Sequence, residues 1–101
     1  MKKKVLLIPP LIILIAGCTS QGSDAVNQCI QLCNEAKNTM NMSNGPCLAN
    51  PIDNYSDWVC DVAHSPRQDV DNQPENQCSA FGVTANHFVE LDENCNFIRE
   101  V

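Results

Sequence analysis

The sequence predicts a small α+β domain stabilised by disulfides, with one N-terminal helix packed on a short antiparallel sheet with long loops. Three observations lead to this fold class. Six cysteines follow residue 24, apolar side chains recur at helical spacing over residues 24–38, and three short segments have the composition of strands. We expect two or three strands, formed by residues 58–63, 87–91 and 95–100.

The first 18 residues have the order of regions found in exported proteins. Lysines occupy positions 2–4, an apolar run covers residues 5–16, and small residues at positions 16 and 17 precede Cys18. This is the charged, apolar and cleavage-site order of a secretory signal. The apolar run is shorter than the roughly 20 residues that a membrane-spanning helix needs.

The last four of these residues, Ile-Ala-Gly-Cys at positions 15–18, resemble the lipobox of prokaryotic lipoproteins. The resemblance implies a signal peptide over residues 1–17 and a diacylglycerol attached to the sulfur of Cys18. A lipidated tether over residues 18–23 would then precede a cysteine-rich domain over residues 24–101. The domain would be anchored to the cell membrane and would face outside the cytoplasm. Cys18, the odd cysteine of seven, would be used for the lipid.

The chain that remains after residue 17 is short and acidic. It has 84 residues, which allows one domain. Three basic residues (Lys37, Arg67 and Arg99) stand against 12 acidic ones, a formal net charge of −9. This charge argues against nucleic acid as a partner and permits binding of cations or of a basic partner. Large apolar residues number 20, too few for a thick core, so we expect disulfides to stabilise the domain.

An even number of cysteines in an exported chain predicts three disulfides. Cys29 and Cys33 lie on the apolar stripe of the predicted helix. Their Cβ atoms would be about 5–6 Å apart, whereas a disulfide needs about 3.8 Å, so each should bond to a different distant segment. Of the fifteen possible arrangements we expect Cys29–Cys60, Cys33–Cys47 and Cys78–Cys95.

Local signals set the expected limits of the other elements. Ser23 or Asp24 is a suitable cap for the helix, and Asn-Gly-Pro at positions 44–46 predicts a turn. In the strand over residues 58–63, the side chains at positions 58, 60 and 62 share a face. Pro74 is expected to begin a short helix that runs to about residue 81. Residues 92–94 are expected to form the turn of a terminal hairpin.

The polar stretch between Cys60 and Cys78 is the candidate binding loop. A loop held between disulfides is preorganised, so a ligand binds it at a smaller entropic cost. Tryptophan and arginine are also favoured interface anchors. A simpler interpretation places the tryptophan in the core and uses the arginine in a structural ion pair. The candidate residues are Trp58, His64, Arg67, Asp69, Asp71 and Glu75.

Segments of the domain resemble small cysteine-rich exported domains of archaea and bacteria. The segments are SNGPCLAN, WVCDVAHSPR, VDNQPENQCSAF and HFVELDENC. The resemblance implies no function beyond that description. The spacing of the cysteines does not match Kazal-type inhibitors, and the Cys-x-Cys strand of CSαβ toxins is missing.

No motif places a nucleophile beside a base, so we expect no enzyme and no catalytic residue. Apart from the lipid at Cys18 we expect no cofactor. The predicted function is non-catalytic binding or an envelope-structural role. The expected partners are the membrane, through the lipid, and a surface or envelope protein or a small ligand. The alternative is a metal-ion-binding surface module that uses acidic side chains or His64 and His87, although the paired ligand spacing of zinc sites is incomplete.

Overall fold

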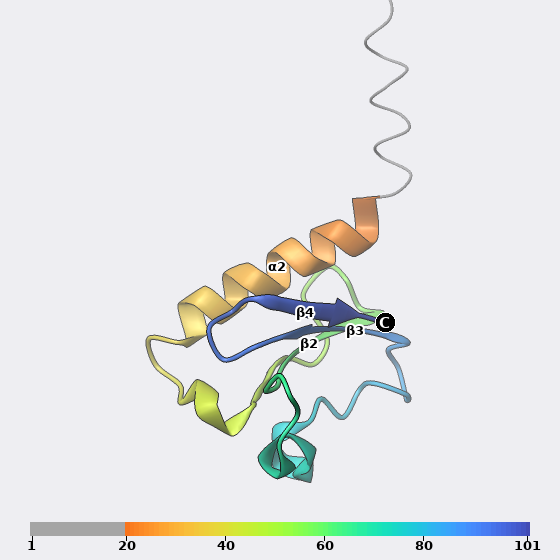
Figure 1. The fold of residues 1–101 in the computed structure, drawn as a ribbon. Helices are drawn as coiled ribbons and strands as arrows, with labels where there is room; N and C mark the ends of the chain where they lie inside the picture. The colour runs from red at the N-terminus through yellow and green to blue at the C-terminus, as the bar shows by residue number, and fades with distance from the viewer. Residues whose placement is uncertain (1–19) are drawn as a thin grey trace, which may run out of the picture.

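The structure, a computed structural model, describes residues 20–101. The predicted signal peptide, the lipobox and Cys18 lie outside the described residues. Helix α2 (Ser20–Ala36) lies across one face of a four-stranded sheet, and the connection after strand β2 lies on the other side (Figure 1). This arrangement confirms the α+β fold class.

The sheet has the order β1-β2-β3-β4, formed by Cys47–Ala49, Trp58–Val62, His87–Leu91 and Phe97–Glu100. The outer pairs are antiparallel, but β2 and β3 are parallel, so the sheet is mixed and not antiparallel as expected. Parallel neighbours require a long crossover, which residues 63–86 supply. Strand β1 was not expected because it is three residues long and follows directly on turn residues.

The helix begins earlier than its capping residues indicate. It starts at Ser20, so residues 20–23, which the sequence assigned to the tether, belong to its first turn. A Cβ atom placed on Gly22 would lie 3.6 Å from the Trp58 ring, so this turn packs closely on the sheet. Ala25, Cys29 and Cys33 are completely buried on the stripe that faces the sheet. Tertiary packing therefore sets the start of the helix here.

The three disulfides are Cys29–Cys60, Cys33–Cys95 and Cys47–Cys78. The first pairing and the separate targets of the two helical cysteines are confirmed. The other two predicted pairings, Cys33–Cys47 and Cys78–Cys95, are wrong. The helix carries Cys33 to the turn between β3 and β4, where Cys95 lies. Cys47 lies in an edge strand of the sheet and bonds to the crossover connection.

In the loops, the predicted turn and hairpin are present, but the predicted helix is shorter than expected. Gly45, in the predicted turn, has a φ of 65° and ends the short 3-10 helix η2 (Met42–Asn44). Pro74 begins a helix as expected, but η4 covers only Pro74–Asn76. Residues 69–72, expected in a loop, form the 3-10 helix η3 (Asp69–Asn72). The terminal hairpin of β3 and β4 is confirmed.

The pairing of the cysteines can be checked with a single protease. The basic residues after position 4 are Lys37, Arg67 and Arg99, so trypsin cuts the domain into three cysteine-bearing pieces that end at these positions. Each disulfide of the structure joins a different pair of pieces. We therefore expect the unreduced digest to keep all three pieces in one covalent assembly, measured by intact mass before and after reduction.

The pairing expected from the sequence gives a different result in the same digest. Cys78–Cys95 would close within the piece that covers residues 68–99, and this piece would be released with one internal disulfide. Detection of that free peptide would contradict the structure. The reduced digest, in which all three pieces separate, is the control for complete cleavage.

Candidate functional site

The side chains on the outer face of the sheet, opposite α2, are partly charged. Because side chains alternate along a strand, β2 points Val59 and Asp61 away from the helix, while its neighbours in the strand pack into the core. Strand β3 pairs with β2 in parallel, with Phe88 opposite Val59 and Glu90 opposite Asp61. Strand β4 adds Arg99 opposite Glu90. The register thus places two acids and one arginine in a row across three strands.

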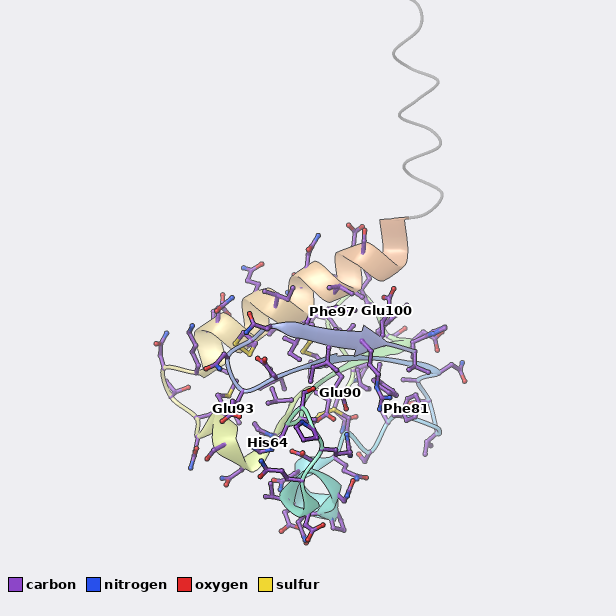
Figure 2. All side chains as sticks on the ribbon, viewed as in Figure 1. His64, Phe81, Glu90, Glu93, Phe97 and Glu100 are labelled. Atoms are coloured by element: carbon purple, nitrogen blue, oxygen red, sulfur yellow. A yellow bond between two sulfur atoms is a disulfide. The ribbon has the colours of Figure 1, made fainter. Side chains whose placement is uncertain are left out.

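Glu90 is the ionic centre of this row. Its side chain is only 6 % exposed and receives two guanidinium groups. Arg67 Nη1 donates to Glu90 Oε2 at 2.8 Å, and Arg99 Nε lies 3.1 Å from Glu90 Oε1. A buried carboxylate with both oxygens paired in this way is well compensated, and removal of either arginine would leave one oxygen without its ion pair. Figure 2 shows Glu90 on the side of the sheet away from the helix.

Arg67 reaches Glu90 from the crossover connection and is held in place by its other donors. Its Nε donates to Asn72 Oδ1 at 2.8 Å, and its Nη2 donates to the Asp71 carbonyl oxygen at 3.2 Å. The arginine therefore ties the loop to the sheet. The structural ion pair of the simpler interpretation is present, and the partner of Arg67 in it is Glu90 of β3.

A cavity of about 260 Å³ opens beside this ionic row. One wall is aromatic: the rings of Phe81 and Phe88 meet edge to face with centroids 4.9 Å apart. The guanidinium of Arg99 lies 5.6 Å from the centroid of Phe88, within the range of a cation–π contact. The lining residues are Val59, Asp61, Arg67, Gln77, Cys78, Phe81, Phe88, Glu90 and Arg99.

Asp61 is the residue of this cavity whose hydrogen bonding is incomplete. Within the described residues 20–101, its Oδ1 atom is buried and has no hydrogen-bond partner. Burial, and next the negative charge of Glu90, raise the pKa of Asp61 from 3.8 to about 7, against the opposing effect of Arg67. The carboxyl group is thus poised between its neutral and ionised forms near neutral pH.

The predicted binding loop contains a second cluster, around Asp71. Its carboxylate is completely buried and accepts hydrogen bonds from the backbone amides of His64 and Gln68, at 3.0 and 2.8 Å, and contacts His64 Nδ1 at 2.9 Å. Burial alone would raise the pKa of Asp71, but these hydrogen bonds outweigh it and hold the pKa below 3.8. His64 Nε2 lies 3.6 Å from Glu93 Oε1, so a carboxylate lies near each nitrogen of the His64 ring.

The structure brings together only part of the predicted binding loop. His64, Arg67 and Asp71 form one hydrogen-bonded unit. Trp58 lies in the core on the helix side of the sheet and stacks on His87 with ring centroids 4.5 Å apart. Asp69 and Glu75 are exposed on η3 and η4, and neither of them lines the cavity.

The described part of the chain contains neither a cluster of metal-binding side chains nor a helix that could span a membrane. Among residues 20–101, no three His, Cys, Asp or Glu side chains come together in an arrangement that could hold a metal ion. The two candidate histidines contact different partners, since His87 Nε2 lies 3.4 Å from Asp57 and His64 contacts Asp71 and Glu93. In the same range, the helix is neither long nor apolar enough to cross a membrane.

Five residues of the cavity were not expected from the sequence: Asp61, Phe81, Phe88, Glu90 and Arg99. A usable signal was present, because Asp61 and Glu90 each stand between two apolar residues of a strand, at a position that points away from the helix. The parallel pairing that sets these two acids side by side was not predicted, so the juxtaposition could not be derived from the strands alone.

We expect Asp61→Asn to stabilise the fold in a pH-dependent way. Because the folded-state pKa of Asp61 is raised, its ionisation destabilises the native chain. The penalty is absent below pH 4, grows up to pH 7 and is complete above it. Relative to the parent chain, the variant should therefore gain up to about 4 kcal/mol between pH 4 and pH 8, at about 1.4 kcal/mol for each pKa unit.

Urea unfolding at pH 4, 6 and 8 measures this difference. Asp69→Asn is the control, because it removes the same charge from an exposed position on η3. A stability difference for Asp61→Asn that stays constant from pH 4 to pH 8 would contradict the raised pKa.

Comparison of the chain with family models, with curated proteins and with solved structures finds no match. The residues of the cavity and their geometry are therefore the basis for any statement about function.

Proposed function

We propose that the chain is a lipid-anchored, extracytoplasmic, disulfide-stabilised module with a non-catalytic binding role, and that the cavity beside Asp61 is its binding site. One observation carries this proposal: a buried carboxylate oxygen without a hydrogen-bond partner, in the wall of a cavity. Buried polar atoms in native proteins are nearly always paired, so an unpaired one calls for an explanation. A ligand that hydrogen-bonds to Asp61 supplies one.

The size of the cavity limits its ligand. Sites for drug-sized molecules usually measure about 300–1,000 Å³. The cavity of about 260 Å³ lies just below that range, so it suits a small molecule or one side chain of a protein partner. Its lining combines an apolar aromatic wall with a few placed charges, which is the usual composition of a specific small-ligand site.

The state of the two histidines gives no support to a catalytic role for either of them. A histidine that acts as a general base needs a ring nitrogen that is free to take a proton from a substrate. His64 contacts a carboxylate at each ring nitrogen and its side chain is 8 % exposed. His87 contacts the Val101 carbonyl through Nδ1 and Asp57 through Nε2. Neither histidine belongs to the lining of the cavity.

The location outside the cytoplasm is supported by the disulfides. All six cysteines of the domain are bonded, a state that persists in oxidising compartments and is rare in the cytosol. The resemblance of residues 1–18 to a lipoprotein signal agrees with such a location. Two acyl chains on Cys18 would provide stable anchoring, whereas one chain gives marginal binding.

The anchor is tested by the intact mass of protein purified from host membranes and alkylated without reduction. We expect a diacylglyceryl adduct on Cys18 and no alkylation of the other six cysteines. Cys18→Ser is the control and should leave the membrane fraction. An unmodified Cys18 in the membrane-purified protein would contradict the anchor, and thiols that react only after chelation would favour the metal-binding alternative.

The cavity is tested with three probes of equal carbon number: n-butylammonium, butyrate and 1-butanol. We expect at least one of them to shift the backbone amide resonances of Asp61, Phe81 and Phe88 saturably in ¹H–¹⁵N spectra of the detergent-solubilised chain. Gln77→Trp, at an exposed lining position, should weaken the response by filling the entrance. Gln31→Trp, on the exposed side of α2, is the matched control.

A response to none of the three probes would count against the cavity as the binding site. So would a response that Gln77→Trp and Gln31→Trp leave equally unchanged, since binding would then take place elsewhere on the surface.

A further inference from the structure

We propose that the cavity binds a small organic cation, an alkylammonium group that forms an ion pair with the Asp61 carboxylate while its alkyl chain packs on Phe81 and Phe88. The source of the group is either a free amine or the lysine side chain of a partner. This inference rests on the proposed function, because it assumes that the cavity is a binding site.

The register of the sheet places two carboxylates side by side, and the arginines beside them are hydrogen-bonded to only one of the two. Asp61 and Glu90 are direct partners on the parallel strands β2 and β3. Glu90 has two arginines, one at each carboxylate oxygen. Asp61 has a buried oxygen with no partner in the described part of the chain. Both carboxylates line the cavity, but only Glu90 is paired with arginines.

The two arginines near Asp61 form their contacts with other groups. Arg67 donates to Glu90, Asn72 and the Asp71 carbonyl. Arg99 contacts Glu90 through Nε and lies over the ring of Phe88. The charged groups near Asp61 are Glu90 of β3, Asp71 of η3, Arg67 of the crossover and Arg99 of β4, and within residues 20–101 neither arginine is hydrogen-bonded to Asp61.

The rest of the cavity suits the body of an alkylammonium. Val59, Phe81 and Phe88 form an apolar wall that a short alkyl chain can cover. The faces of aromatic rings also attract cations, and Arg99 already uses the face of Phe88 in this way. The cavity volume of about 260 Å³ accommodates a four-carbon chain with its ammonium group.

An anion is disfavoured by the same observations. Glu90 pairs with both arginines, and Arg67 donates to protein acceptors through all three of its nitrogens, so Arg67 is not available to a carboxylate or phosphate. The formal net charge of −9 on the chain after residue 17 repels anions and attracts cations during encounter.

Access to the buried oxygen requires only side-chain movement. The χ2 torsion of an aspartate is broad and roughly two-fold, so its two oxygens exchange positions readily. The Arg99 side chain, which lines the cavity, is 56 % exposed and is not part of the core. Binding therefore leaves the sheet and the disulfides in place.

The test measures the affinity of n-butylammonium for the full, detergent-solubilised chain at pH 5.5 and pH 8, from the shifts of the Asp61 and Phe88 amide resonances. Only the ionised carboxylate forms the ion pair, and the pKa of Asp61 is about 7. We expect binding to be about 30-fold tighter at pH 8, the ratio of the ionised fractions at the two pH values. Asp61→Asn should abolish binding at both, whereas Asp69→Asn should bind like the parent chain.

Butyrate and 1-butanol separate the failure of this inference from failure of the proposed function. Butyrate binding that strengthens toward pH 5.5, without butylammonium binding, would overturn the cationic ligand but retain the cavity as a site. Equal affinity for butylammonium and 1-butanol would also overturn the ion pair. No response to any probe would overturn the binding site itself.

The source of the cation is read from one more probe, N-α-acetyl-lysine methylamide. Binding tighter than that of butylammonium supports a lysine side chain presented by a protein partner, because the flanking backbone then adds contacts at the entrance. Weaker binding supports a free amine, since a backbone at the entrance would clash.

Discussion

Two disulfides from a single stripe of α2 determine which face of the sheet becomes the core. Cys29 and Cys33 lie one helical turn apart and bond to β2 and to the turn before β4. The helix is thereby fixed across the sheet in one orientation, and the apolar side chains of β2 and β3 fill the space beneath it. With only 20 large apolar residues after position 17, burial alone would provide a small margin of stability, which makes these covalent ties decisive.

Once the helix covers one face, the opposite face must be covered by irregular chain. The Cys47–Cys78 disulfide holds this connection at one end, and the buried Asp71 carboxylate organises it by binding the amides of His64 and Gln68. Gly45 completes the arrangement, since any side chain there would collide with the Asp71 carboxylate. The loop so ordered presents Arg67 to Glu90 and leaves a cavity where it does not reach the sheet.

Much of the fold could be predicted because it depends on local patterns. The helical spacing of Cys29 and Cys33 indicated that both face inward, and alternation identified the strand from Trp58 and the terminal hairpin. The parallel pairing of β2 and β3 depends on the path of residues 63–86, which carry no periodic signal. Since that pairing places Asp61 beside Glu90, the candidate site was as unpredictable from the sequence as the crossover itself.

The cost that Asp61 imposes on the fold is itself an argument for a role. An apolar residue at this position would pack beside Val59, Phe88 and the Cys47–Cys78 disulfide, which form the smaller core cluster on this face. The chain instead carries a carboxyl group whose burial opposes its ionisation and whose buried oxygen is unpaired in the described structure. Positions that break the rules of folding without local compensation are those where proteins carry function. Ionisation of Asp61 costs free energy of folding, and a bound cation would reduce that cost, so cation binding and the stability of the fold are coupled.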